Sequence, residues 1–329
     1  MSNFIKNIID KLFPSSTGRK DQDSFDPGPY SSGGINLNSS KKGQTSTNFN
    51  AATAPLTEDQ LADLQLKSNQ IEPKQLIVGV GRDVGRQRQN NEDSIFSLST
   101  IIDSNETSLP VGIFIVADGM GGHNNGEVAS ELAVRTMSYH LVKTLYPAIF
   151  SPKPHAPENS LQEILISGVT QANEMINKHS NGGGTTLTAA LTIGSQMTIA
   201  HVGDSRAYSI FLDGRMEPLT RDHSLVSRLV ELGQITEEEA KHHPQKSTLY
   251  NAVGQSTVPR PDIVNANFPQ PGYLMICSDG LWGVLEEDDM FTIITNASSP
   301  QRACQDLVDA ANAAGGPDNI AVILAKLSE

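Results

Sequence analysis

Acidic residues stand at the polar ends of apolar runs, where buried strands would carry them into the interior of a fold. Asp118 and Asp279 each follow such a run, Asp318 comes shortly before one, and Glu92 lies upstream. A buried carboxylate is costly unless it is paired or bound to a metal ion. Several that converge would form the all-oxygen site that hard cations prefer. The pattern therefore predicts metal-assisted chemistry on an anionic substrate.

The composition of the chain excludes several classes of protein. Its 329 residues carry a formal net charge of −13, so no basic surplus exists to neutralise a nucleic acid backbone. No stretch approaches the roughly 18–20 apolar residues of a membrane span, and the first residues do not match a signal peptide. The two cysteines, Cys277 and Cys304, lie far apart and are expected to be buried, reduced thiols of a cytoplasmic protein.

A shift in composition near residue 74 marks the boundary between an N-terminal arm (1–73) and a folded domain (74–329). Residues 14–55 are rich in Ser, Gly, Asn, Thr, Gln and Pro and have almost no apolar periodicity. They are expected to be a disordered linker, because they bury too little surface to offset their ordering entropy. Residues 56–72 carry a capping-box pattern and suggest a short helix.

Residues 4–13 form an amphipathic pattern within the arm. Their apolar side chains fall at positions 4, 5, 8, 9, 12 and 13, along one face of a helix. Such a helix is expected either to dock weakly on a partner or a membrane surface, or to be a terminal helix that is marginal in water. The sequence leaves both interpretations open.

From residue 75 onward, strand-like and helix-like patterns alternate. The predicted strands are residues 75–81, 94–102, 111–117, 185–193, 197–202, 207–211, 273–278 and 320–327. The predicted helices are residues 127–145, 161–178, 224–232, 236–242, 288–294 and 301–313. Hairpin signals join neighbouring strands, whereas helices come in pairs. This order predicts an α+β fold, a four-layer α-β-β-α sandwich of two antiparallel sheets flanked by helices.

Seven short motifs follow one another along this domain. They are Arg-Gln-Asn-Asn-Glu-Asp (88–93), Asp-Gly-Met-Gly-Gly-His (118–123), Gly-Gly-Gly-Thr-Thr-Leu (182–187), His-Val-Gly-Asp-Ser-Arg (201–206), Leu-Thr-Arg-Asp-His-Ser (219–224), Cys-Ser-Asp-Gly-Leu-Trp (277–282) and Gly-Gly-Pro-Asp-Asn-Ile (315–320). Each motif alone is weak, since Asp-Gly is also an ordinary turn. Their succession resembles the PP2C-type (PPM family) metal-dependent protein serine/threonine phosphatases, especially the bacterial branch, over about residues 76–328.

The resemblance implies a site for two Mn²⁺ or Mg²⁺ ions with a water between them. Asp118 matches the carboxylate that bridges both ions. Asp279 and Asp318 match further ligands of one ion, whereas Glu92 and the Gly119 carbonyl match the shell of the other. Such a pair lowers the pKa of the water and holds the phosphoryl oxygens for in-line attack.

The resemblance also assigns roles around the metal site. Arg88 matches the arginine that binds the substrate phosphate, and its planar fork suits two phosphate oxygens. Asp204 matches a position that can ligate a weaker third ion, although a purely structural turn competes with that role. Met120 stands where many relatives carry a histidine general acid, so either water or His123 is expected to protonate the leaving group. Residues 222–254 match a flap beside the active site.

We therefore expect a cytoplasmic, monomeric phosphatase that hydrolyses phosphoserine and phosphothreonine in proteins phosphorylated by a serine/threonine kinase. One alternative is a catalytically silent phosphoprotein-binding regulatory module of the same fold, and the retained carboxylates speak against it. Another is a phosphatase of small phosphate esters, and the flap favours peptides over these. Nucleic acid is not an expected partner, because the chain is acidic.

Deleting residues 1–70 should leave the turnover of para-nitrophenyl phosphate unchanged, because the arm is expected to have no catalytic role. The measurement compares kcat and KM of the truncated and full-length proteins in the presence of Mn²⁺. A collapse of turnover in a truncated protein that stays folded would place the start of the catalytic domain before residue 74.

Overall fold

The computed structural model describes residues 73–104, 107–121, 125–255 and 257–328, which contain two antiparallel sheets. One sheet has the strand order β1 (Leu76–Asp83), β11 (Ile320–Leu327), β10 (Gly272–Cys277), β7 (Arg206–Phe211) and β8 (Met216–Pro218). The other has the order β2 (Asp93–Ser104), β3 (Thr107–Met120), β5 (Leu187–Ile193), β6 (Gln196–Val202) and β9 (Asp262–Asn267), with β4 (Gly184–Thr185) paired with β3. The helices predicted over residues 4–13 and 56–72 lie outside the described residues.

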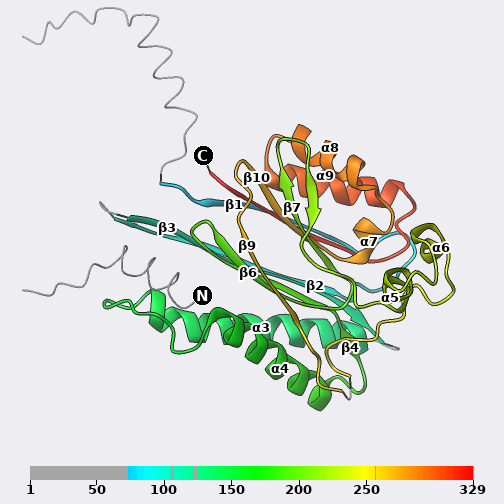
Figure 1. The fold of residues 1–329 in the computed structure, drawn as a ribbon, viewed down its shortest axis with the longest axis horizontal. Helices are drawn as coiled ribbons and strands as arrows, with labels where there is room; N and C mark the ends of the chain where they lie inside the picture. The colour runs from blue at the N-terminus through cyan, green and yellow to red at the C-terminus, as the bar shows by residue number, and fades with distance from the viewer. Residues whose placement is uncertain (1–72, 105–106, 122–124, 256, 329) are drawn as a thin grey trace, which may run out of the picture. The chain divides into compact units, whose positions relative to one another are not determined.

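Helices cover the outer face of each sheet (Figure 1). The β2-β3-β5-β6-β9 sheet lies against α3 (Asn125–Ile149) and α4 (Leu161–His179). The β1-β11-β10-β7-β8 sheet lies against α8 (Glu287–Asn296) and α9 (Pro300–Ala313). Three shorter helices complete the described part, namely α5 (Leu225–Glu231), α6 (Glu237–Lys241) and α7 (Asp279–Trp282). The predicted four-layer α-β-β-α sandwich is confirmed.

Apolar layers on both faces of β3 explain its sequence. Phe114 and Val116 belong to the layer between the two sheets, while Ile113 and Ile115 face the layer beneath α3 and α4. Successive residues of a strand point to opposite faces, so a strand that is covered on both faces is apolar throughout. This arrangement accounts for the unbroken apolar run at residues 113–117.

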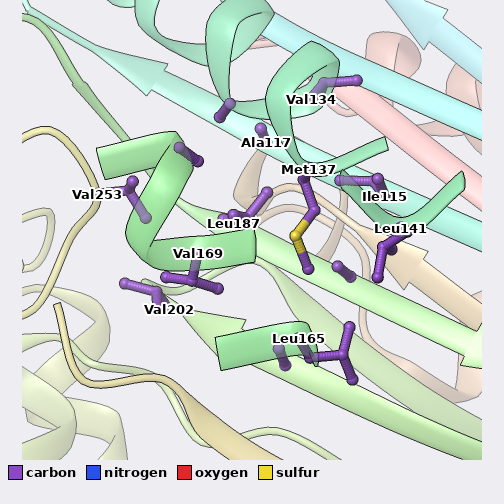
Figure 2. Packing of buried hydrophobic residues seen from close by; sticks show 14 of the residues in the cluster. Ile115, Ala117, Val134, Met137, Leu141, Leu165, Val169, Leu187, Val202 and Val253 are labelled. Carbon is purple, nitrogen blue, oxygen red and sulfur yellow. The ribbon is translucent and has the colours of Figure 1, made fainter. Parts of the chain in front are cut away.

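The layer beneath the helices depends on close packing of α3 against α4. Met137 and Leu141 of α3, Leu165 of α4 and Ile115 of β3 belong to one buried cluster (Figure 2). Gly168 allows the two helices to approach, because a Cβ atom at this position would lie 2.4 Å from the sulfur of Met137. The sheet above therefore rests on a rigid helical layer.

Local capping signals fix where two of the long helices begin. The Ser160 hydroxyl accepts a hydrogen bond from the Glu163 amide, and the Glu163 carboxylate accepts one from the Ser160 amide, which is a capping box at the start of α4. Helix α9 starts after the cap Ser299 with Pro300 in its first turn, where a missing amide hydrogen has no cost.

The structure corrects the sequence-based elements in a few places. Residues 185–193 do not form one strand, because the Asp118 amide donates to the Thr186 hydroxyl and not to the Thr186 carbonyl, which interrupts the pairing with β3 between β4 and β5. The sequence also missed β8, β9 and the one-turn helix α7. Prolines flank β9, and they are tolerated there because β9 is the edge strand of its sheet.

Several buried polar residues match their predicted roles. Cys277 and Cys304 are free and fully buried, and burial raises the pKa of each thiol to about 12. His201 lies inside β6, where its ring is hydrogen-bonded to the Thr188 hydroxyl and the Arg221 carbonyl. Within the described ranges, no helix combines the length and apolarity that crossing a membrane would require.

Replacing Phe114 by Ala should destabilise the domain by about 3–5 kcal/mol, because it leaves a cavity between the sheets where Phe114 is wholly buried. Urea unfolding monitored by circular dichroism measures the loss. Val258→Ala is the control, since Val258 is 72% exposed and its truncation should change the free energy of unfolding by no more than about 0.5 kcal/mol. Equal effects of the two substitutions would contradict the assigned core.

Candidate active site

The two sheets place acidic residues at one common end. Asp93 begins β2 and is the cross-strand partner of Asp118 on β3. Asp118 lies inside β3 rather than beyond its end, because the strand continues to Met120. Asp93 is fully buried, and its carboxylate accepts a 2.7 Å hydrogen bond from the Ser278 hydroxyl of the other sheet's loop. The Ala321 amide donates to the same hydroxyl, so Ser278 links the two sheets beneath the acidic residues.

The other sheet contributes two of the predicted residues at this end. Asp279 opens α7 directly after β10, and Asp318 lies just before β11. The charge of Asp279 acts on the carboxyl group of Asp118. Asp204 follows β6 and is only 8% exposed. The structure thus places Asp118, Asp279, Asp204 and Asp318 close enough to act on one another electrostatically.

Burial, and after it mutual repulsion, raises the pKa values of Asp93, Asp118, Asp204 and Asp279. Burial raises the pKa of Asp118 well above its usual range, and the charges of Asp93 and Asp279 raise it further. The pKa of Asp204 rises to about 8, first through burial and then through the charge of Asp279. For Asp93 burial outweighs the Ser278 hydrogen bond, and its pKa rises to about 7. Such a set is stabilised by a cation, which removes the repulsion.

The donor atoms fit a divalent cation in type. Oδ1 of Asp93 and Oδ1 of Asp279 are buried and accept no hydrogen bond from the described residues. These are oxygen atoms, which Mg²⁺ and Mn²⁺ prefer. Throughout the part of the chain that the structure describes, however, no three Asp, Glu, His or Cys side chains converge closely enough to coordinate one ion as they stand. The ligand roles of the individual residues therefore stay predictions.

Arg88 contacts one of the predicted ligands directly. Its guanidinium donates to Oδ2 of Asp318 at 2.7 Å, and its side chain is 51% exposed. It also lines a polar recess of about 160 Å³ together with Glu92 and Asn319. Burial raises the pKa of Glu92, and the nearby positive charge of Arg88 opposes that rise. The recess combines a half-exposed cation with acidic neighbours, which suits a phosphate group that approaches bound metal ions.

Gly119 has a steric reason to be glycine. A Cβ atom at this position would lie 2.2 Å from the carbonyl oxygen of Gly126 at the start of α3. The Gly119 amide donates to the Glu92 carbonyl at 3.1 Å, which ties the loop of Glu92 to β3. The next residue, Met120, pairs with Gly184 of β4. His123, the alternative proton donor, lies outside the described residues.

Asn319 organises the loop before β2, and the sequence interpretation missed this role. Its side-chain oxygen accepts a 2.8 Å hydrogen bond from the Glu92 amide, and its amide nitrogen donates to the carbonyls of Val84 and Asn90. Asn319 is only 5% exposed. An asparagine directly after the predicted ligand Asp318 was the available signal, since a buried side-chain amide usually bonds to backbone groups.

Two threonines hold the backbone of Asp118. The Thr186 hydroxyl accepts a 2.8 Å hydrogen bond from the Asp118 amide. The Thr185 hydroxyl donates to the Asp118 carbonyl at 2.8 Å. The sequence showed the two threonines but not their partner, because the contact joins residues far apart in the chain.

Arg206 anchors the base of the predicted flap, residues 222–254. It forms two hydrogen bonds with the Asp222 carboxylate, at 3.0 and 2.8 Å, and its guanidinium lies 3.5 Å from the centre of the Trp282 ring. The Trp282 indole donates to the Asp204 carbonyl at 3.1 Å. The ring of His223 accepts a hydrogen bond from the Gly203 amide. The flap is therefore joined to the loop that carries Asp204.

With this geometry established, comparison with known proteins defines the class. Residues 78–320 match the model of the family described as protein phosphatase 2C. The match covers most of the chain and includes all the predicted site residues. The chain belongs to the protein phosphatase 2C family.

Individual relatives are similar along almost their whole length. The serine/threonine phosphatase stp of Listeria welshimeri is 37% identical over 244 residues, which are 74% of this chain and 92% of that protein. The solved serine/threonine phosphatase of S. agalactiae has a TM-score of 0.66 and 32% identity, covering 77% of this chain and all of that one. The catalytic domain of PstP, solved in complex with two manganese ions, has a TM-score of 0.62 and 29% identity, covering 77% and 99% of the two chains.

Asn319→Ala should raise the Mn²⁺ concentration that gives half-maximal activity by about 10- to 100-fold, because it releases the loop that carries Glu92. Metal titration of turnover on para-nitrophenyl phosphate measures the shift. Asn265→Ala is the matched control, since Asn265 is also hydrogen-bonded, to Thr198, but lies on β9. An unchanged metal requirement in a folded Asn319→Ala protein would contradict the positioning role.

Proposed function

We propose that this chain is a metal-dependent protein serine/threonine phosphatase that uses a water molecule as the nucleophile. One observation carries this function: buried carboxyl groups of both sheets, whose pKa values are raised by burial and then by their mutual charge, gather at one end of a protein phosphatase 2C fold. Divalent cations stabilise a site of this kind because they neutralise its negative charge. An arginine beside it supplies a further positive charge that can bind the phosphate group of the substrate.

We propose Asp118 as the ligand shared by two cations. Asp279 and Asp318 are the proposed further ligands of one cation. Glu92 and the Gly119 carbonyl are the proposed further ligands of the other. Support comes from the electrostatic influence of Asp279 on Asp118 and from the buried Oδ1 of Asp279, which accepts no hydrogen bond from the described residues. When bound, the paired cations lower the pKa of a water molecule and hold the phosphoryl oxygens. Either Mn²⁺ or Mg²⁺ suits these oxygen donors.

Asp204 is the proposed ligand of a weaker third cation. Its carboxyl group is nearly buried, and the charge of Asp279 raises its pKa. Both features favour a cation close to Asp204. The hydrogen bond from Trp282 to the Asp204 carbonyl is the competing explanation, because it stabilises the turn in the absence of a cation. A third ion at this place would be optional for turnover.

Arg88 is the proposed phosphate ligand. Its guanidinium presents several donors in one plane, and half of its side chain is exposed beside the polar recess. In the structure Asp318 occupies one of those donors. Cation binding by Asp318 would free the guanidinium for two phosphate oxygens, so the same residue pair links metal binding to substrate binding.

The chain offers little for protonating the leaving group. Met120 carries no exchangeable side-chain proton, so water is the proposed proton donor, with His123 as the alternative.

The proposed substrates are phosphoserine and phosphothreonine in proteins modified by a serine/threonine kinase, and the proposed role of the enzyme is in cytoplasmic signalling. Its free, buried thiols suit a reducing compartment. We propose that residues 74–329 form this catalytic domain, that it acts as a monomer, and that residues 1–73 form a non-catalytic arm.

Full-length protein should release phosphate from phosphoserine and phosphothreonine peptides, lose this activity with a chelator and regain it with Mn²⁺ or Mg²⁺. Asp118→Asn should lower kcat by roughly 10²–10³-fold, since metal coordination supplies several kcal/mol of transition-state stabilisation. Asp213→Asn serves as the control, because Asp213 is 57% exposed and pairs with Arg215 outside the site. Phosphate release is measured with malachite green.

Each alternative has its own signature in the same assay. Near-normal turnover by Asp118→Asn would exclude the proposed bridging role. Calorimetric Mn²⁺ binding without turnover by the wild-type protein would instead support the catalytically silent module. Turnover of sugar phosphates in preference to phosphopeptides would support an enzyme of small phosphate esters.

A further inference from the structure

An apolar groove runs between the edge strand β2 and the C-terminal half of α3, on the helix-covered face of the sheet. Leu98 and Val111 line it from the strands, and Val142, Tyr146 and Phe150 line it from the helix. Its volume is about 230 Å³, and no charged residue lines it. A groove with these walls suits apolar side chains.

The helix side of the groove continues as an exposed apolar stripe. Tyr139, Val142 and Tyr146 are 66%, 37% and 60% exposed, and Leu98 opposite them is 38% exposed. Positions i, i+3 and i+7 lie on one face of a helix, and Phe150 extends the stripe with its ring 5.5 Å from that of Tyr146. A contiguous exposed apolar surface of this kind marks a binding site more often than chance exposure.

The N-terminal arm contains a segment with matching dimensions. Residues 4–13 carry six apolar side chains at helical spacing. As a helix they would be about 14 Å long, and the stripe from Tyr139 to Phe150 is about 16 Å long, at 1.5 Å per residue. A helix this short is marginal in water unless its apolar face is covered.

The chain enters the domain close to the groove. The Lys74 carbonyl accepts a 3.4 Å hydrogen bond from the Ser108 hydroxyl. Ser108 comes three residues before Val111 on β3, a separation of about 10 Å. About 60 residues connect position 13 to position 74, and a coil of that length spans roughly 40–45 Å. The tether therefore reaches the groove easily and holds the segment at a high local concentration.

We propose that residues 4–13 dock as an amphipathic helix in this groove of the same chain. The six apolar side chains cover Leu98 and the Tyr139–Phe150 stripe, and Lys6, Asp10 and Lys11 face water. Intramolecular docking requires only weak intrinsic affinity, because the tether replaces a bimolecular encounter. The docked segment is then withdrawn from membranes and other proteins.

The docking site lies at the far end of the sheet from the acidic residues. The Thr100–Val111 pair is seven residues along the β2–β3 ladder from the Asp93–Asp118 pair, which is about 23 Å. Docking at this distance leaves the catalytic groups untouched. Docking must therefore be detected by a structural measurement and not by an activity assay.

Thiol cross-linking of the full chain tests this docking. Both native cysteines are buried, so Asn7→Cys and Lys143→Cys introduce the accessible thiols. A short bismaleimide should join them within one chain at low protein concentration, as seen by mass spectrometry after proteolysis. The matched control pair is Asn7→Cys with Asp309→Cys, which places the second thiol on α9 in the opposite helical layer and should cross-link little.

Two further substitutions separate docking from chance proximity. Leu98→Glu in the groove and Ile8→Glu in the arm should each reduce the Asn7–Lys143 product to the yield of the control pair. Ile8→Glu keeps the test decisive if Leu98→Glu unfolds, since Ile8 belongs to the proposed arm and not to the core of the two sheets. Equal yields in all variants, products that only join two chains, or recovery of the wild-type protein on phosphatidylglycerol vesicles without an intrachain product would each overturn the docking.

Discussion

Repulsion among buried carboxyl groups is the constraint on which the rest of this structure depends. Asp118 experiences burial together with the charges of Asp93, Asp204, Asp279 and Asp318. Gathering these groups opposes folding, because each desolvated charge disfavours the next. The surrounding structure holds them in place all the same, and a bound cation turns the same arrangement into a favourable one. Metal affinity and domain stability are therefore coupled in this protein.

Hydroxyl side chains supply part of that restraint. The Ser278 hydroxyl joins the Asp93 carboxylate to the Ala321 amide, and the Thr186 hydroxyl accepts a hydrogen bond from the amide of Asp118. The threonine contact acts on the main chain of Asp118 and leaves its carboxylate oxygens available. The backbone of Asp118 is therefore held by a contact that does not pass through its own titrating atoms.

The sequence predicted the layers of the fold and the identity of the acidic residues, because both follow from local patterns. The run at residues 113–117 is apolar on both faces and could only be a covered strand. Contacts between distant segments were beyond that reasoning. Arg88 and Asp318 are 230 positions apart, and no local sequence pattern predicts their ion pair. The break at Thr186 was missed for the same reason, since its cause is the amide of Asp118 on another strand, which donates to the Thr186 hydroxyl.

The placement of the cysteines has a consequence for the enzyme under oxidative stress. Cys277 and Cys304 are wholly buried, and burial raises the pKa of each thiol to about 12, so almost no thiolate exists at neutral pH. Peroxide attacks the thiolate, and accessible thiolates most readily. In the proposed mechanism the nucleophile is water, so neither thiol takes part in the reaction. Oxidation of a catalytic thiolate, which inactivates thiol-based phosphatases, would then not be a route to inactivation of this one.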